Sequence, residues 1–282
     1  MRVVAISAAA LAWLAAGAAA AQERYAVRGV TVRDAAALVR VVPEERADVA
    51  VSVVNPGPLP APSVRVSRGR LLIDGQLRRQ IRSCRVRGSD FEVVTSRQGR
   101  LSVAQLPTIE LRVPREADLS AGGAVRLHVA PAQSARVRLD GCGDADIVRV
   151  DEEAEIAVSG AADLRLYEAG SAEISMAGGG DVVVGVVREG LRLSIAGAGD
   201  FTAARADGPT NIAVQGAGDV TIRDGRATTL SVAIAGAGDV VHNGSAERLD
   251  VVILGGGDVR VAAVSGEVTR RILGGGEVRI GR

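Results

Sequence analysis

The chain has 282 residues, enough for one large domain or two small ones. Its formal net charge of +1 excludes a global field that would steer nucleic acid or another polyanion. Aromatic residues make up only 2% of the chain, whereas Gly occurs 35 times, so we expect a thin, regular core rather than a thick globular one.

The N-terminal segment, residues 1–21, predicts a secretory signal peptide. A single charge at Arg2 precedes an apolar run, and Ala19 and Ala21 fit the small-residue rule for cleavage before Gln22. The run is short for a membrane span, and strand-like sequence follows at once. We therefore expect an exported protein, periplasmic or at the cell surface of a Gram-negative bacterium, with no integral membrane segment after cleavage.

Residues 22–118 carry a strand signal without a clean period. Residues 48–54 and 70–75 are typical of strands, and residues 55–62 form a turn-rich loop. We expect this part to form irregular first turns of the fold that follows it, or a β-cap on that fold. A cap is needed because the end of a stacked sheet exposes an unpaired edge.

Eight arginines between residues 63 and 88 face a single acid, Asp74, and form a candidate patch for an anionic ligand. Arginine binds phosphate and carboxylate groups well, and an ordinary solvated face is the alternative in a chain whose 34 basic residues are all Arg. The patch comprises Arg65, Arg68, Arg70, Arg78, Arg79, Arg82, Arg85 and Arg87.

The chain has two cysteines, Cys84 and Cys142, which allow one intramolecular disulfide. Export to an oxidising compartment favours this pairing. A reactive thiol is the alternative, but neither cysteine has a His near it in the sequence.

Residues 119–282 repeat one corner motif, Gly-x-Gly-Asp, at intervals of 18 to 20 residues. Apolar residues alternate with polar or variable ones on both flanks of each corner, which is the pattern of a half-buried strand. One such unit cannot bury its apolar face alone, whereas stacked copies share a core. We therefore predict an all-β fold, a parallel β-helix or solenoid with turns of about 19 residues. The repeated acids are Asp144, Asp163, Asp181, Asp200, Asp219, Asp239, Asp258 and Glu277.

The corner itself predicts a tight structural turn. In this interpretation Gly supplies a positive φ, the small middle residue avoids a clash between successive turns, and Asp accepts backbone hydrogen bonds in an Asx-type turn. The structural-turn residues are Gly178, Gly180, Asp181, Gly197, Gly199, Asp200, Gly216, Gly218, Asp219, Gly236, Gly238, Asp239, Gly255, Gly257 and Asp258.

A cation ladder is the alternative function for the corner acids, formed by Asp181, Asp200, Asp219, Asp239 and Asp258. Stacked carboxylates would lie about 4.8 Å apart, and bound Ca²⁺ would relieve their repulsion. The known calcium-binding repeat needs a Gly/Asp turn about every nine residues, and here the alternate turns lack one. We therefore favour the structural turn and assign no metal or cofactor.

No catalytic residues are predicted. His242 falls in an apolar column of the repeat, where a packed side chain is expected, and His128 is isolated. The acidic run at residues 151–155 could supply the paired carboxylates of a glycosidase. The few aromatic residues of the chain are scattered and form no platform for a sugar, so a solvated charged turn is favoured.

The serial corners resemble a known family, the putative auto-transporter adhesins with a head GIN domain. The residues that carry the resemblance are GAGD at 197–200, 216–219 and 236–239, with GGGD at 178–181 and 255–258, while 141–144, 160–163 and 274–277 depart from the pattern. The match is specific over residues 119–282. It implies a right-handed β-helix similar to those of pectin lyases, without their catalytic residues, and a role in adhesion.

Together these observations predict an exported, non-enzymatic β-solenoid that acts as an adhesin or as a binding or structural module of the cell envelope. Its partner would be an envelope glycan, a lipid headgroup or a protein, and not nucleic acid. Two alternatives stay open, a carbohydrate-active β-helix enzyme and a Ca²⁺-stabilised secreted solenoid. The oligomeric state also stays open.

Overall fold

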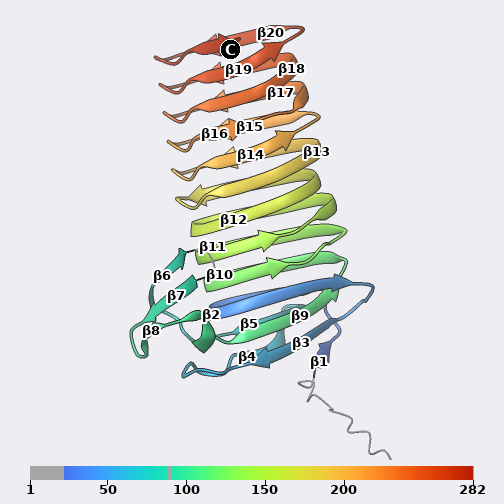
Figure 1. Cartoon of the computed structure of the whole chain (residues 1–282), viewed down its shortest axis with the longest axis vertical. Coiled ribbons are helices and arrows are strands. Elements are labelled where there is room, and N and C mark those ends of the chain that lie inside the picture. The colour runs from blue at the N-terminus through green and yellow to red at the C-terminus, as the bar shows by residue number, and fades with distance from the viewer. Residues whose placement is uncertain (1–21, 88–89, 282) are drawn as a thin grey trace, which may run out of the picture.

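The protein is a parallel β-solenoid that rises as a stack of two-stranded turns, here called rungs (Figure 1). The computed structural model describes residues 22–87 and 90–281, so the predicted signal peptide, residues 1–21, lies outside the described residues. Equivalent residues of successive rungs lie in register, as Asp144 does with Asp163. The predicted all-β solenoid with a repeat of about 19 residues is confirmed.

The regular rungs run from β10 to β21, and each contributes one strand on either side of its corner. In the lower rungs, toward the N-terminus, the long strands β10, β11 and β12 each continue through one corner, whereas in the upper rungs shorter strands flank each corner. Their bounds are β10 (Glu116–Val129), β11 (Ser134–Ile147), β12 (Val150–Gly178), β13 (Val182–Ile195), β14 (Phe201–Ala206), β15 (Thr210–Val214), β16 (Val220–Ile222), β17 (Arg226–Ile234), β18 (Val240–Ile253), β19 (Val259–Val264), β20 (Val268–Ile272) and β21 (Val278–Ile280).

Alternation along each strand builds the core. Leu193, Ile212 and Val232 are buried inside the stack and lie in register on three successive rungs. Their chain neighbours Arg192 and Asn211 point outward from the same strands. Successive β-strand side chains point to opposite faces, so a strict period of two buries one aliphatic ladder and leaves a polar ladder in solvent.

The first rung in the sequence is not the first rung in the stack. Strand β2 (Gly29–Glu44) lies between β10 on one side and the pair β5 (Arg70–Asp74) and β9 (Thr108–Pro114) on the other. All three pairings are parallel, so the solenoid ladder extends well into residues 22–118. The rung made by β5 and β9 is split, because residues 75–107 are inserted where other rungs have their corner.

Antiparallel strands close the N-terminal end of the stack. Strand β4 (Ser63–Ser67) pairs with β5, β3 (Val49–Val54) pairs with β9, and β1 (Glu23–Tyr25) pairs with β3. These strands cover the outer edge of the split rung, which a parallel neighbour would otherwise occupy.

The insertion forms a separate small sheet beside the first rungs (Figure 1). It contains β6 (Ile81–Arg87), β7 (Asp90–Thr95) and β8 (Gly99–Leu101), paired antiparallel, followed by a short 3₁₀ helix η1 (Val103–Gln105). Among the described residues no helix is long and apolar enough to span a membrane.

Candidate binding surfaces

The glycines of the corner are required by the neighbouring rung. A Cβ atom placed on Gly255 would lie 2.1 Å from the carbonyl oxygen of Gly236, and one on Gly257 would lie 2.2 Å from that of Gly238. The middle residue, Gly256, has no heavy atom within 4 Å of such a Cβ and is exposed. The prediction that the middle residue avoids a clash is therefore wrong: the flanking glycines avoid it, and the middle residue faces solvent.

The corner acids form a hydrogen-bonded ladder along this edge. The backbone N–H of Asp200 donates to Oδ1 of Asp181 at 3.0 Å, and the N–H of Asp219 donates to Oδ1 of Asp200 at 2.9 Å. The same bond recurs from Asp163 up to Glu277. Each carboxylate thus caps the next rung rather than its own turn, which corrects the predicted Asx-type turn. No group of three or more His, Cys, Asp or Glu within residues 22–87 and 90–281 is arranged to hold a metal ion.

The inserted sheet covers the corners of the first rungs. A second apolar cluster lies beneath it, in which Phe91 and Val93 of β7 are packed with the corner residues Ala36 and Ala124. These alanines lie in register with Cys142, so they occupy the middle position of the corner motif. The middle position of the corner is therefore open to solvent in the C-terminal rungs, whereas in the first rungs it is apolar and covered by the inserted sheet.

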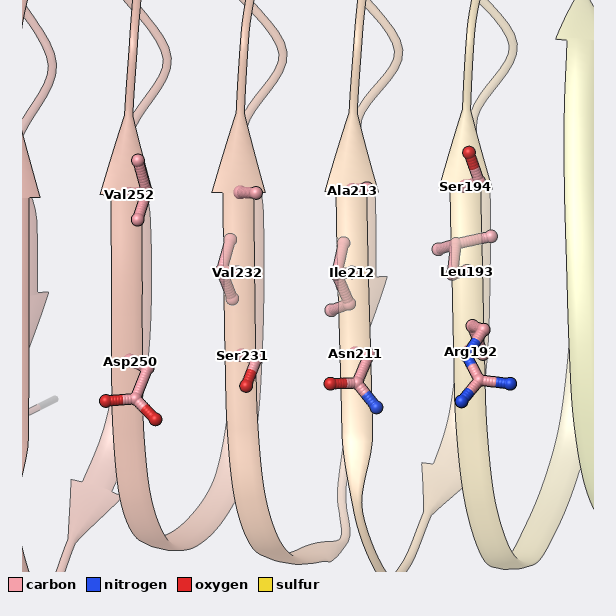
Figure 2. A pocket seen from close by; sticks show the side chains of 11 residues that line it. Arg192, Leu193, Ser194, Asn211, Ile212, Ala213, Ser231, Val232, Asp250 and Val252 are labelled. Atoms are coloured by element: carbon pink, nitrogen blue, oxygen red, sulfur yellow. The ribbon is translucent and has the colours of Figure 1, made fainter.

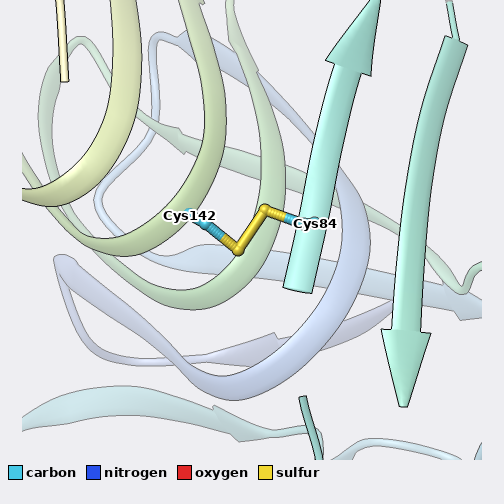
Figure 3. The surroundings of a disulfide bond; sticks show 2 residues. All are labelled: Cys84 and Cys142. Atoms are coloured by element: carbon cyan, nitrogen blue, oxygen red, sulfur yellow. A yellow bond between two sulfur atoms is a disulfide. The ribbon is translucent and has the colours of Figure 1, made fainter. Parts of the chain in front are cut away.

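A disulfide joins the inserted sheet to the solenoid (Figure 3). The sulfur atoms of Cys84, on β6, and Cys142, at a rung corner, are bonded, with the two Cα atoms 6.1 Å apart. A cross-link over 58 residues restricts the unfolded chain and holds the sheet against the rungs.

We call residues 76–102 the basic arm. They comprise the inserted sheet with the turn before it, and they contain seven Arg and two acids. Five of the eight arginines predicted to form one patch lie on this arm and are exposed: Arg78, Arg79, Arg82, Arg85 and Arg87.

The other three arginines of the predicted patch lie elsewhere. Arg65 and Arg68 belong to the β4–β5 hairpin, and Arg70 lies on the outer face of the solenoid. The Arg70 guanidinium passes over Gly29 to Asp118, and its Nε donates to the Thr31 hydroxyl at 3.0 Å. A side chain at position 29 would occupy the space of this guanidinium. Arg70 therefore stabilises the stack, and the patch is smaller than the sequence indicates.

A part-buried ion pair beneath the arm was missed by sequence reasoning. Nε of Arg126 donates to Oδ1 of Asp144 at 2.9 Å, and the guanidinium lies 5.4 Å from the ring centroid of Phe91 on the arm. Asp144 is only 6% exposed, unlike the acids at the corners above it. The signal that could have identified it is Cys142 in the same corner, because a covalent link there implies a covering segment.

A shallow depression lies on the outer face of the upper rungs (Figure 2). It has a volume of about 530 Å³ and spans four successive rungs. One row of outward side chains runs Arg192, Asn211, Ser231 and Asp250, so it begins with a cation and ends with an anion. The second row has small side chains, including Ser194 and Ala213. The floor is therefore open to an extended polar partner.

His242 lies in the core, and two acids of the acidic run form surface ion pairs. His242 is fully buried in the aliphatic core, and neither ring nitrogen has a hydrogen-bond partner. Burial lowers the pKa of His242 below its usual value; backbone groups of His242 and Gly244 oppose this shift without reaching hydrogen-bonding geometry. In the acidic run, Asp151 pairs with Arg149 at 2.9 Å and Glu155 pairs with Arg138 at 3.2 Å.

These features define an all-β solenoid whose surface is built from repeated outward ladders, with a basic arm fixed over its first corners. The chain matches the family described as putative auto-transporter adhesin, head GIN domain, over residues 69–187 and 187–281. It therefore belongs to this family, as the corner motifs predicted. A search of curated proteins gives no match.

Solved structures share the fold at low sequence identity. A putative adhesin from Parabacteroides distasonis is 14% identical, with a TM-score of 0.56, and the alignment covers 92% of this chain and 96% of that one. A putative lipid binding protein from the same species is 16% identical, with a TM-score of 0.53 and coverage of 93% and 96%. A putative adhesin from Parabacteroides merdae is 13% identical, with a TM-score of 0.54 and coverage of 93% and 96%. At these identities the likeness concerns the fold alone.

Proposed function

We propose that the protein is an exported, non-enzymatic binding module of the bacterial cell envelope, with adhesion as its role. Membership of an adhesin-named family supports this, as do the sequence of residues 1–21 and a disulfide, which suits an oxidising compartment. The periplasm or cell surface of a Gram-negative bacterium is the location we propose.

The outward depression across four rungs is the observation that carries this proposal. Its first row offers an amide at Asn211, a hydroxyl at Ser231 and a carboxylate at Asp250, beside the Arg192 guanidinium, which is paired with Glu173 at 3.2 Å (Figure 2). Side chains of this kind bind extended polar chains by hydrogen bonds, and they do so without a deep pocket. An envelope polysaccharide or an extended peptide can lie along the stack and contact one rung after another. The hydrogen bonds between parallel strands hold the backbone of this face in place, so binding costs little conformational entropy of the protein.

Binding to envelope components tests the proposal. The probes are an array of bacterial surface glycans and an extract of envelope proteins, used with the whole exported chain. Ala213→Trp fills the depression from its second row, whereas Thr221→Trp places the same side chain on β16, on the other side of the corner and away from the depression. We expect Ala213→Trp to weaken binding at least about tenfold and Thr221→Trp to leave it unchanged. Failure of the wild-type chain to bind any probe contradicts the function, and equal binding by both variants contradicts the site.

A further inference from the structure

The basic arm concentrates positive charge at one place on the molecule. Residues 76–102 hold seven Arg against Asp90 and Glu92, a net charge of 7 − 2 = +5. The whole chain has a net charge of +1, so all remaining residues together carry 1 − 5 = −4. The near-neutral total therefore conceals a strong separation of charge between the arm and the solenoid.

The arginines of the arm are available to an external partner. Five arginines of the arm are exposed, and none of them forms an ion pair with an acid within residues 22–87 and 90–281. They are Arg78, Arg79, Arg82, Arg85 and Arg87. The cross-strand neighbours of Arg85 and Arg87 on β7 are Glu92 and Asp90. Glu92 is taken up by Arg100 of the arm at 3.2 Å. On the solenoid, in contrast, ion pairs across rungs engage Arg136, Arg138, Arg165, Arg188, Arg192, Arg205 and Arg248.

The arm presents these charges on the free face of a fixed sheet. Phe91 and Val93 on β7 are buried against the rungs, and Cys84 is bonded to Cys142. Side chains alternate between the faces of a strand, so Arg85 and Arg87, on either side of the half-buried Val86, point away from the solenoid. The outward face of this three-stranded sheet therefore presents several arginines together, which fits a surface of anionic groups.

The acids near the arm restrict how such a plane can approach. The corner ladder starts at Asp163, above the corners that the arm covers, and continues to Glu277 on the same edge of the stack. A negatively charged plane lying along that edge would meet these carboxylates. It is repelled there and attracted at the arm, so contact at the arm end alone is favoured.

We propose that the basic arm docks on anionic phospholipid headgroups and holds the N-terminal end of the solenoid against a membrane surface. Guanidinium groups pair with the phosphate groups, and the arm needs no apolar insertion to bind. The rungs then stand away from the membrane, with their outer faces free for the partner described above. This inference rests on the proposed envelope location and adds a means of retention there.

Vesicle binding tests the docking surface. The whole exported chain is sedimented with vesicles of phosphatidylglycerol and phosphatidylcholine, and separately with phosphatidylcholine alone, at about 50 mM salt. The test variant is Arg82→Gln/Arg85→Gln/Arg87→Gln. The control variant is Arg223→Gln/Arg260→Gln/Arg271→Gln. It removes three exposed arginines of the solenoid that form no ion pair with an acid in the part of the chain that the structure describes. Both variants therefore have the same net charge.

We expect binding only to the anionic vesicles. The test variant should bind about 100-fold more weakly, because each arginine near an anionic surface contributes about fivefold, while the control variant should bind as wild type does. An equal loss in both variants, or no binding to anionic vesicles, overturns the proposal. Binding to soluble dextran sulfate without binding to vesicles also overturns it, in favour of a polyanionic glycan.

Two further measurements keep the outcomes separate. Melting followed by circular dichroism shows whether the test variant is folded, and an unfolded variant is replaced by Arg78→Gln/Arg79→Gln on the turn before β6. The envelope screen with Ala213→Trp does not depend on the arm. If the wild-type chain binds envelope components but not anionic vesicles, docking alone is refuted. If it binds anionic vesicles but no envelope component, the proposed function alone is refuted.

Discussion

The three glycines of one corner make a matched series for testing how the rungs fit together. Alanine at Gly255 or Gly257 places a Cβ 2.1 or 2.2 Å from a carbonyl oxygen of the rung below, against a practical minimum of 3.0 Å. The rungs would have to separate locally by 3.0 − 2.1 = 0.9 Å or 3.0 − 2.2 = 0.8 Å. That shift stretches the bond from Gly256 N–H to the carbonyl oxygen of Gly236, which is 2.9 Å long.

The expected effects differ in sign across neighbouring positions. Overpacking costs about 1–3 kcal/mol, and weakening the backbone hydrogen bond adds about 1 kcal/mol, so Gly255→Ala and Gly257→Ala should each lose about 2–4 kcal/mol of unfolding free energy. Gly256→Ala meets no atom and reduces the entropy of the unfolded chain, so it should be neutral or gain up to about 1 kcal/mol.

Urea unfolding followed by far-ultraviolet circular dichroism measures all three variants under one condition. Their order is the decisive result, because a stack of repeats can unfold in more than one step while the ranking of midpoints remains valid. Equal midpoints for the three variants, or Gly256→Ala as the least stable, would refute the argument that the rung below selects glycine.

Three further predictions follow from other contacts. His242→Val should raise stability by about 1–3 kcal/mol, because it removes two buried ring nitrogens without partners. The pKa of His242 is lower in the folded than in the unfolded chain, so the stability of the wild type should fall as the pH drops below the unfolded-state pKa of about 6.5. His242→Val should lack this pH dependence. Identical stability profiles for the two proteins between about pH 7 and pH 5 would contradict the argument. Asp219→Ala should lose about 0.5–1.5 kcal/mol, because Oδ1 accepts from the N–H of Asp239 at 2.8 Å, and Asp219→Asn should lose less because it keeps an acceptor; a gain in both variants would show that repulsion dominates the ladder. Thiol titration of the denatured, unreduced protein should find neither Cys84 nor Cys142 free, and two reactive thiols would exclude the bond.

The repeat could be predicted from sequence because each rung repeats the same local pattern. The apolar positions around Ile212 and Val232 recur at nearly constant spacing, and a period of two determines which side chains are buried. The reason for the glycines could not be derived in the same way. It lies in the carbonyl of a residue 19 or so positions earlier, and φ preferences within one turn do not include that contact.

The candidate surface was only partly predictable. Charge counts along the chain identify a basic segment, but they cannot show that Arg70 is turned toward Asp118 while Arg85 faces solvent. That difference depends on residues 75–107 leaving the ladder at a corner, which no turn signal in the sequence distinguishes from an ordinary loop. The depression beside Asn211 depends on small side chains from four rungs, so it exists only once the stack is formed.

The position of β2 in the stack has a consequence for how the chain folds as it emerges. Strand β2 is synthesised before all three strands that flank it in the ladder, which are β5 and β9 on one side and β10 on the other. A chain that crosses a membrane N-terminus first cannot close this nucleus until residue 129 has arrived. Long-range contacts form slowly, so we expect the base to close more slowly than the later rungs, each of which adds about 19 residues to its neighbour. We therefore expect the base of the stack, although it is first in the sequence, to be completed late.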